Sequence, residues 1–381
     1  MSGRSATDTG PSRDDLRHVA EARDLAVAIP VRPWPNPPVG AVVVRDGVVV
    51  GRGAHHGAGT AHAERVALDA AGSAARGATL YCTLEPCHHH GRTPPCSGAI
   101  VDAGIARVVF GVRDPNPLAG GGADHLRGVG VEVLGGVLAA ECLDLIWPFV
   151  CTDQFARPYV ELKTATSLDG RFGRATDPPG QPGYLTGAAA RRDVHARRRW
   201  VDLVLVGSGT ARRDRPRLDA RLADSPLDGP TAPPLAGVVA RDGAAAAALD
   251  RDRWLVFHAA GRSGALAAGA EGVACAGGPD GQLDLHDLLS AGTARGVHAL
   301  MVEGGPRLAA SFLAAGLVDR WVQYVAPTVV GDGPAWPAWT AASPVDFTLS
   351  SVARLGRDLR LVWDRREVAA ELRRLGTPEV A

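Results

Sequence analysis

The chain has 381 residues, and its 41 basic residues balance its 41 acidic residues, so the formal net charge at pH 7 is zero. This length suits two domains better than one. A neutral chain without an extended basic stripe argues against a nucleic-acid-binding protein, because phosphate contacts dominate such affinity. The apolar runs are too short for a membrane span, and segment 1–15 lacks the apolar core of a secretory signal.

The lysine and cysteine residues of the chain are both informative. Lys163 is the only lysine, so the other forty of the 41 basic residues are arginine. Two of the six cysteines are candidate metal ligands, and the others show no disulfide-like spacing, which favours a reducing cytoplasm. The cysteines are Cys82, Cys87, Cys96, Cys142, Cys151 and Cys275.

Helices and strands are predicted to alternate in the N-terminal half. Apolar spacing predicts a first helix over 13–29, and Asp46-Gly47 closes a hairpin between strands at 41–44 and 48–51. Helices at 61–71 and 96–103 and strands at 78–83 and 106–111 follow. This order predicts a three-layer α/β domain.

Four residues of this half form a candidate zinc site. His62 and Glu64 lie in the first turn of the helix at 61–71, Cys87 follows the strand at 78–83, and Cys96 opens the next helix. One histidine and two cysteines can bind Zn²⁺ and leave the fourth position to water, beside which Glu64 would lie without being a ligand. Both helices would direct their positive N-terminal ends at the site. This is the arrangement of zinc deaminases that act on nucleobases, in which the glutamate transfers protons.

The spacing of the cysteines differs from the common deaminase pattern. Eight residues separate Cys87 from Cys96 where two are usual, and Pro94-Pro95 could direct the returning chain at the metal. The tract His88–His90 offers competing imidazoles. The alternative is therefore a closed zinc knuckle with one of these histidines as fourth ligand, although such a site would not need Glu64.

The pattern breaks around 147–157, where a domain boundary is expected. A strand at 159–165 and the turn 167–171 open the second half, which also has two Pro-rich loops, at 174–183 and 221–236. Further helices are predicted at 188–200, after the glycine turn 207–210, and at 307–315. Further strands are predicted at 201–206, 300–303, 321–326 and in a pair flanking 350–363. A surface helix or tail is expected after residue 366, and no element is predicted within 237–299.

Two glycine turns in this half could bind phosphate. Gly304-Gly305-Pro306 lies between a strand and a helix, where free backbone N–H groups would face an anion. Gly207-Ser208-Gly209-Thr210 lacks the third glycine of a dinucleotide fingerprint. A plain strand-to-helix connection is the alternative for both turns.

Motifs in both halves resemble those of one family, the bifunctional deaminase–reductases of riboflavin biosynthesis. In the first half these are Asn36–Gly40, Thr83–Cys96 with the same eight-residue insertion, and Asp114–Pro117. In the second half they are Lys163, Ser167–Arg171, Thr186, Arg191–Val194, Asp214 and Val302–Pro306. The resemblance covers residues 14–365. It implies a cytidine-deaminase-like α/β/α domain at 12–152 and a dihydrofolate-reductase-like α/β domain at 157–367.

The resemblance also implies two reactions. The first domain would use Zn²⁺ to deaminate 2,5-diamino-6-(5-phosphoribosylamino)pyrimidin-4(3H)-one. The second would use NADPH to reduce the ribosyl group of 5-amino-6-(5-phosphoribosylamino)uracil to ribityl. The expected partners are small pyrimidine ribotides, with no nucleic acid or membrane, in the cytoplasm, and a homo-oligomer is left open.

Site residues follow from the resemblance position by position. The deaminase would use Glu64 for catalysis and His62, Cys87 and Cys96 for zinc. Its substrate contacts would be Asn36, His55, Arg92 and Asn116. The reductase substrate contacts would be Lys163, Arg198, Leu218, Arg221 and Glu303. Its cofactor contacts would be Thr166, Tyr184, Thr186, Thr210, Asp214, Gly305, Pro306, Arg307 and Leu308.

The chain departs from the family pattern at a few positions. His88 stands where the family often has serine, and Tyr184 where it often has tryptophan. Arg215 replaces an acidic residue or asparagine that often precedes Pro216, and Pro182-Gly183 replace a serine. Apart from His88, these departures lie in the reductase half, near the expected cofactor contacts.

Two other functions compete with this interpretation. One is a zinc deaminase of cytidine or of a base in RNA, which the neutral charge and the long insertion disfavour. The other is a non-catalytic zinc module joined to a nucleotide-binding module without turnover. Glu64 argues against the latter, because a structural zinc site has no use for a positioned acid–base group.

Overall fold

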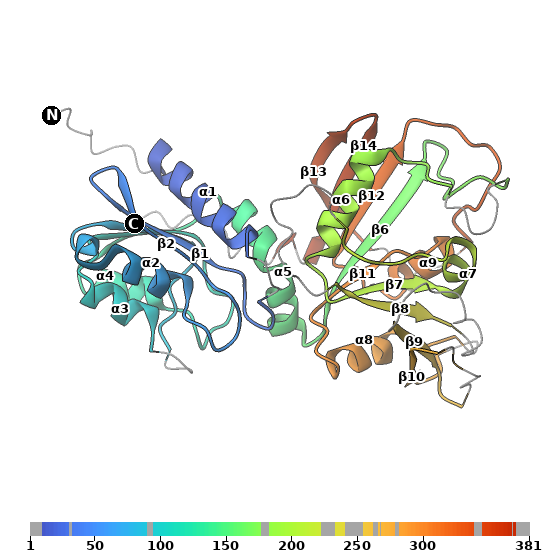
Figure 1. Ribbon diagram of the computed structural model, residues 1–381, viewed down its shortest axis with the longest axis horizontal. Helices are drawn as coiled ribbons and strands as arrows, with labels where there is room; N and C mark the ends of the chain where they lie inside the picture. The colour runs from blue at the N-terminus through green and yellow to red at the C-terminus, as the bar shows by residue number, and fades with distance from the viewer. Residues whose placement is uncertain are drawn as a thin grey trace. The chain divides into compact units, whose positions relative to one another are not determined.

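A computed structural model describes residues 10–29, 33–89, 94–176, 183–221, 233–240, 254–261, 266, 268–278, 282–338, 345–367 and 369–370. The chain divides into two compact units (Figure 1). The first comprises the residues up to Phe155 and those from Ala370 onward, and the second comprises Ala156–Ala369. Each unit has its own sheet.

The first unit is built on a five-stranded sheet of order β2-β1-β3-β4-β5. Its strands are β1 (Gly40–Arg45), β2 (Val48–Ala54), β3 (Thr79–Leu84), β4 (Arg107–Val112) and β5 (Glu132–Leu134). Its helices are α1 (Arg13–Val27), α2 (Ala63–Ala71), η1 (Gly72–Ala75), α3 (Cys96–Asp102), α4 (Gly122–Gly128) and α5 (Ala139–Phe155). Strand β1 is antiparallel to β2 and β3, whereas β3, β4 and β5 run parallel.

Helices cover both faces of this sheet. A Cβ on Gly40 would meet the Ala22 carbonyl of α1, whereas a Cβ on Gly53 would meet the Ala63 carbonyl of α2. Gly53 pairs with Ala41, the neighbour of Gly40, and successive strand residues face opposite sides. Helices α1 and α2 therefore lie on opposite faces, and the predicted three-layer α/β class is confirmed.

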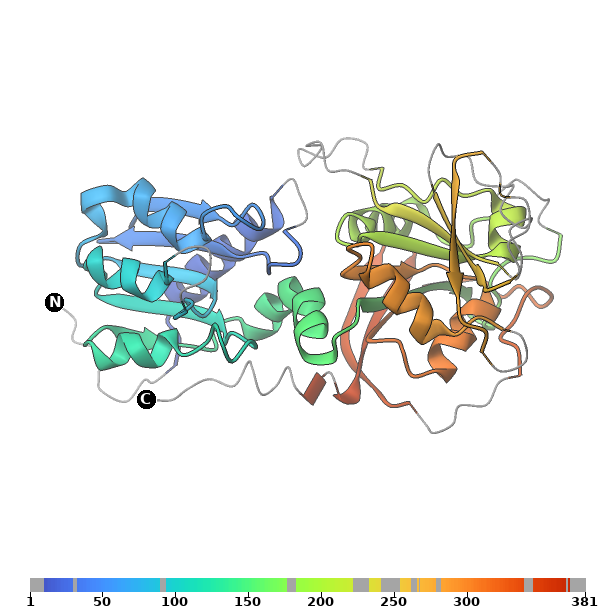
Figure 2. The ribbon, with the colours of Figure 1, turned by 90° about the horizontal axis from the view of Figure 1, so that it is seen from below.

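The second unit is built on a nine-stranded sheet of order β10-β9-β8-β7-β11-β6-β12-β14-β13. Its strands are β6 (Tyr159–Ser167), β7 (Leu203–Gly207), β8 (Leu235–Val239), β9 (Trp254–Ala259), β10 (Ala270–Cys275), β11 (Ala299–Val302), β12 (Arg320–Ala326), β13 (Phe347–Leu355) and β14 (Asp358–Arg365). Its helices are α6 (Ala188–Arg198), α7 (Ser208–Asp214), α8 (Leu285–Thr293) and α9 (Pro306–Ala314). The seven strands from β10 to β12 are parallel, and the β13–β14 hairpin adds two antiparallel strands. Figure 2 shows the same ribbon from a second side.

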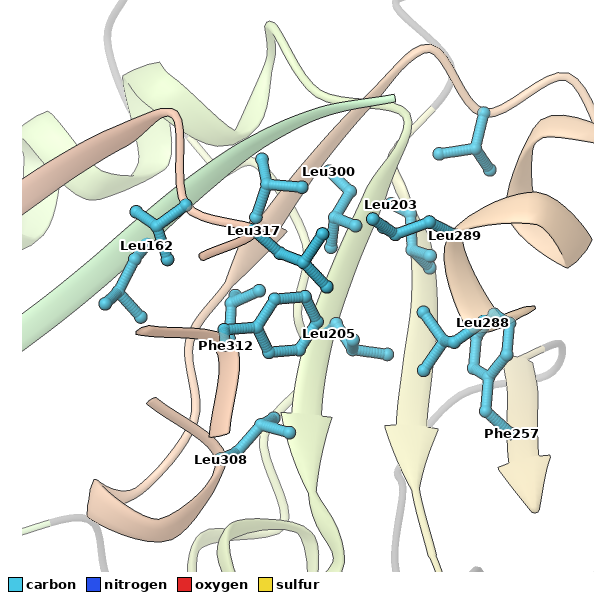
Figure 3. Close-up of a cluster of buried hydrophobic side chains, with 14 of the residues drawn as sticks. Leu162, Leu203, Leu205, Phe257, Leu288, Leu289, Leu300, Leu308, Phe312 and Leu317 are labelled. Atoms are coloured by element: carbon cyan, nitrogen blue, oxygen red, sulfur yellow. The ribbon is translucent and has the colours of Figure 1, made fainter. Parts of the chain in front are cut away.

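The strand order reverses between β7 and β11. Strands β7 to β10 proceed outward in one direction, and β11 then returns to lie between β7 and β6. Ligands of open parallel sheets bind outside the carboxyl ends of the strands at such a reversal. The reversal is stabilised by an apolar core that includes Leu203 and Leu205 of β7, Leu300 of β11 and Phe312 of α9 (Figure 3).

The structure corrects several sequence predictions. Residues 147–155 are not a break in pattern, because α5 runs through Pro148 to Phe155. Trp147, Val150 and Cys151 are all buried in this helix. Because its apolar residues are not confined to one face, the sequence lacks the periodic pattern that identifies a helix. His62 was predicted in the first turn of a helix that begins at residue 61, but α2 begins at Ala63 and His62 is its N-cap.

Several elements of the second unit were missed. Strand β8 begins at Leu235, inside the predicted loop 221–236, and β9, β10 and α8 lie in the stretch without predictions. All residues of β9 are buried, and such strands lack the polar alternation that identifies a strand. Residues 371–381 of the predicted terminal helix or tail lie outside the described residues.

Candidate active sites

Three ligand atoms meet in the first unit. His62 Nδ1 lies 3.5 Å from Cys87 Sγ and 3.3 Å from Cys96 Sγ, and all three donor atoms lie within 4.8 Å of one another. Tetrahedral zinc with bonds of about 2.1 Å to nitrogen and about 2.3 Å to sulfur would separate such atoms by about 3.6 Å. The donor set and its spacing therefore fit zinc.

Secondary structure places these donors. His62 precedes α2, Cys96 is the first residue of α3, and Cys87 follows β3. The Cys96 backbone N–H points at Cys87 Sγ over 3.4 Å, as expected where a thiolate meets a helix N-terminus. A hydrogen bond from the Cys96 thiol, together with His62, lowers the pKa of Cys87 against the effect of burial.

Glu64 lies buried beside this cluster. Only 4% of the surface of Glu64 is exposed. Burial is the main cause that raises the pKa of its carboxyl group to about 7, and the negative charge of Cys87 is the second cause. A carboxyl group that titrates near neutrality is suited to both accepting and donating a proton.

Asn36 and His55 form a polar pair next to His62. Asn36 Nδ2 lies 3.0 Å from His55 Nε2, and His55 Nδ1 lies 3.1 Å from the Ala61 carbonyl. Donation from Nδ1–H to Ala61 leaves Nε2 free to accept from Asn36. Burial is the main cause that lowers the pKa of His55, which favours this neutral form. The His55 ring meets the His62 ring edge-on, with centroids 5.3 Å apart.

Asn116 belongs to a loop whose backbone is hydrogen-bonded by the side chain of Glu85. Asn116 Oδ1 accepts from Leu118 N–H over 2.9 Å. The buried Glu85 carboxylate accepts backbone N–H groups of Asp114 at 3.1 Å and Ala123 at 3.0 Å. Glu85 lies inside the Thr83–Cys96 motif, but no role was predicted for it. Arg92 lies outside the described residues.

His88 is directed away from the three ligand atoms. Its Nδ1 lies 2.8 Å from Ser97 Oγ, and its ring stacks on His125 with centroids 4.2 Å apart. Among the described residues, the cluster of potential metal ligands contains His62, Cys87 and Cys96 alone. A closed knuckle through His88 therefore finds no support, and His90 lies outside the described residues.

The second unit has a cavity of about 1950 Å³ at the strand reversal. Strands β6, β7, β8 and β11 direct their carboxyl ends toward it. The residues predicted as reductase contacts that line it are Lys163, Tyr184, Thr186, Arg198, Thr210, Asp214, Leu218, Arg221, Glu303, Gly305, Pro306, Arg307 and Leu308. Thr166 is the exception. Lys163 and Ala165 of β6 face the cavity, whereas Thr166 is buried and is absent from the lining, so its predicted cofactor contact is not supported.

Glu303 is the charged centre of this cavity. The Arg198 guanidinium binds its two oxygens at 2.5 Å and 2.9 Å, and Lys163 Nζ lies 3.5 Å away. Burial alone would raise the pKa of Glu303, but Arg198 and Lys163 more than offset it and lower the pKa to about 2. The carboxylate is therefore anionic throughout the physiological range.

The glycine turn before α9, at residues 304–306, is hydrogen-bonded to the other glycine turn, at residues 207–210. Gly305 N–H donates to Thr210 Oγ1 over 3.1 Å, and Pro306 occupies the first helical position of α9. Arg307 and Leu308 therefore lie in the first turn of α9. Backbone N–H groups in the first turn of a helix have no hydrogen-bond partner within the helix. An anion in the cavity could bind there.

Two further residues of α6 contribute to the cavity wall. The Arg191 guanidinium lies over the Tyr184 ring, 4.7 Å from its centroid. Tyr184 thus makes a cation–π contact although it stands where the family often has tryptophan. His195, to which sequence analysis assigned no role, lines the cavity and lies 3.0 Å from the Asp219 carbonyl. Arg198 donates to the same carbonyl over 2.8 Å. The three-residue spacing of His195 and Arg198 on one helix is the signal that could have indicated it.

A His-Cys-Cys centre with a buried glutamate, followed by a doubly wound sheet with a large cavity, defines a two-domain enzyme of the deaminase and reductase type. Residues 13–112 match the family model of the cytidine and deoxycytidylate deaminase zinc-binding region, and residues 158–361 match that of the RibD C-terminal domain. Riboflavin biosynthesis protein RibD of Aquifex aeolicus is 39% identical over 308 residues, which are 78% of this chain and 83% of that protein.

Solved structures agree over nearly the whole length. RibD of Acinetobacter baumannii is 33% identical with a TM-score of 0.74, and covers 93% of this chain and 99% of its own. A diaminohydroxyphosphoribosylaminopyrimidine deaminase/5-amino-6-(5-phosphoribosylamino)uracil reductase of Thermotoga maritima is 31% identical with a TM-score of 0.75, and covers 92% and 98%. The chain belongs to the RibD family of riboflavin biosynthesis proteins.

Proposed function

We propose that this chain catalyses two successive steps of riboflavin biosynthesis. The first unit deaminates 2,5-diamino-6-(5-phosphoribosylamino)pyrimidin-4(3H)-one, and the second uses NADPH to reduce the ribosyl group of 5-amino-6-(5-phosphoribosylamino)uracil to ribityl. The observation that carries the proposal is the grouping of His62, Cys87 and Cys96 beside the buried Glu64. The named activities of the Thermotoga maritima relative support the substrates.

Deamination replaces the 2-amino group of the pyrimidine by oxygen from water and releases ammonia. When bound by His62, Cys87 and Cys96, zinc lowers the pKa of a water molecule, so that hydroxide is available near neutrality. Glu64 takes the proton from that water and delivers it to the departing amino group, a role that suits its raised pKa. Asn36 and His55 orient the pyrimidine ring, and Asn116 and Arg92 contact the ribotide.

Reduction transfers a hydride to C1′ of the ring-opened, imine-like ribosylamine and a proton to its nitrogen. When bound, NADPH supplies the hydride. Lys163 contacts the ribose and assists proton movement as the ring opens, while Glu303 and Arg198 fix the position of its ammonium group. The remaining substrate contacts are Leu218 and Arg221. Thr210, Asp214 and the first turn of α9 hold the cofactor, together with Tyr184 and Thr186.

The two activities belong to different parts of the chain, residues 12–152 and 157–367. Among the described helices, none is long and apolar enough to span a bilayer. All six cysteines are free thiols, which supports the cytoplasm as the compartment. The neutral charge supports small pyrimidine ribotides as ligands in preference to nucleic acid.

The decisive experiment incubates the protein with the diaminopyrimidine ribotide, with and without NADPH, and follows the products by mass spectrometry. Without NADPH we expect ammonia and the uracil ribotide, and with NADPH the ribityl product. Release of ammonia from cytidine but not from the ribotide would establish a different pyrimidine deaminase. A uracil ribotide that persists in the presence of NADPH would indicate a second unit that binds nucleotides without turnover.

A further inference from the structure

The two thiol ligands are nine positions apart, and the backbone alone brings the ends of the segment between them together at two points. Cys96 N–H points at Cys87 Sγ over 3.4 Å, and Ser97 N–H donates to the Cys87 carbonyl over 3.2 Å. Before a metal binds, these two contacts and the approach of both sulfur atoms to His62 Nδ1 hold the thiol groups in place. The residues immediately following each ligand are therefore important.

A side-chain contact also joins the two ends of this segment, between residues that are nine positions apart like the two cysteines. His88 follows Cys87, Ser97 follows Cys96, and His88 Nδ1 lies 2.8 Å from Ser97 Oγ. Ser97 is fully buried in the first turn of α3. The pair therefore joins the chain just after one ligand to the helix that begins with the other.

The His88 ring is also fixed from its other side. It stacks on the ring of His125 in α4, with centroids 4.2 Å apart and planes at 23°. The His88 backbone N–H donates to the Ala119 carbonyl over 2.9 Å. A side chain held at its ring face and at Nδ1 has little rotamer freedom left to lose, so its contact with Ser97 is preorganised.

We propose that His88 is a positioning residue of the zinc site, which keeps Cys87 and Cys96 at zinc-binding separation through its contact with Ser97. The proposal rests on the zinc site of the proposed deaminase, and it goes beyond that function by assigning a role to the histidine tract. Residues that orient metal ligands typically change metal affinity by about 10-fold to 100-fold when they are removed. Because His88 is exposed on its outer side, its truncation opens no buried void.

The variants are His88→Ala, Ser97→Ala, the double variant, and His88→Asn. The asparagine side chain can place a hydrogen-bonding atom near the position of Nδ1. His56→Ala, which removes another exposed imidazole of the same unit, is the matched control. The zinc dissociation constant of the full chain is measured by competition with a chelator, and the thermal unfolding of the zinc-loaded protein is measured in parallel.

We expect His88→Ala and Ser97→Ala each to weaken zinc binding by about 10-fold. The double variant should be no weaker than the worse single variant, because both changes remove one interaction. His88→Asn should stay close to the wild type, and His56→Ala should leave the zinc affinity unchanged. The unfolding temperature of the zinc-loaded His88→Ala and Ser97→Ala variants should fall by only a few degrees, the loss that about 10-fold weaker zinc binding itself causes. Unchanged zinc affinity in both single variants, losses that multiply in the double variant, or failure of His88→Asn to rescue would each overturn the proposal.

The deaminase assay separates this proposal from the proposed function. A wild type that binds zinc without deaminating the ribotide would refute the function and leave the positioning role intact. A wild type that deaminates, with variants that keep full zinc affinity, would refute the positioning role alone.

Discussion

Glu303 is shared by two cations of different shape. Arg198 occupies both carboxylate oxygens with its planar fork, whereas Lys163 approaches one oxygen with a single ammonium group at 3.5 Å. Arginine holds every other basic position of the chain, so a lysine here stands out. The geometry gives a reason, because a second guanidinium would compete with Arg198 for the same oxygens.

Lys163→Arg should therefore impair reduction almost as severely as Lys163→Met. In the proposed contact, a compact ammonium would fit between Glu303 and the ribose, whereas a wide guanidinium would not. Assays with the diaminopyrimidine ribotide and NADPH should show normal ammonia release and accumulation of the uracil ribotide. A Lys163→Arg enzyme that reduces at the wild-type rate would show that any cation suffices.

Glu303 should also make stability depend on pH in the acid range. Its pKa falls from an ordinary 4.5 to about 2 in the folded chain, so its stabilising contribution is complete above pH 4.5 and is lost as the pH falls toward 2. The shift corresponds to at most about 3 kcal/mol. Unfolding by urea at several pH values should show a difference between wild type and Glu303→Gln that narrows from pH 4.5 downward. A difference that stays constant over this range would contradict the lowered pKa.

Glu64→Ala should retain zinc and lose deamination by about 10²-fold to 10⁴-fold, because the variant lacks the group that transfers protons but keeps all three ligands. Metal analysis and ammonia release measure the two properties, and reduction of added uracil ribotide is the internal control. Loss of zinc together with activity would mean that Glu64 supports the metal itself.

At the scale of elements, the site was easier to predict than the fold around it. The residue types of His62, Cys87 and Cys96 follow from zinc chemistry, and the family resemblance accounts for the eight residues between the cysteines. The sequence therefore indicated all three ligands, and the structure brings them together. Strand β9 and helix α5 are apolar on most sides and offer no periodic contrast, so they were missed. The roles of Glu85 and His195 depend on loops that reach them only in the folded chain.

The connection between α7 and α9 can be tested at this scale. Thr210→Val removes the acceptor of Gly305 N–H while keeping the shape of the side chain. A lost hydrogen bond of this kind costs about 0.5–1.5 kcal/mol, so NADPH should bind roughly 2-fold to 10-fold more weakly. Fluorescence titration with NADPH measures this, and Thr210→Ser, which restores the hydroxyl, should recover the affinity. Equal affinities of Thr210→Val and wild type would show that the turn does not depend on this contact.

At the scale of the whole molecule, each unit has its own means of stability. The first sheet ends with β5, the second begins with β6, and the core around Leu205 and Phe312 consists of residues of the second unit. The described residues that could hold a metal all belong to the first unit. The cavity at the strand reversal is lined by the second unit alone.

Removal of zinc should therefore separate the two activities in the intact chain. After treatment with a chelator that is then removed, ammonia release from the diaminopyrimidine ribotide should be abolished, because no other group lowers the pKa of water there. Reduction of added uracil ribotide by NADPH should continue at its original rate, since neither Lys163 nor Glu303 depends on the metal. Stoichiometric Zn²⁺ should restore deamination, and Mg²⁺, which prefers oxygen ligands, should not. Loss of both activities on chelation would show that the second unit needs the metal-loaded first unit in order to function.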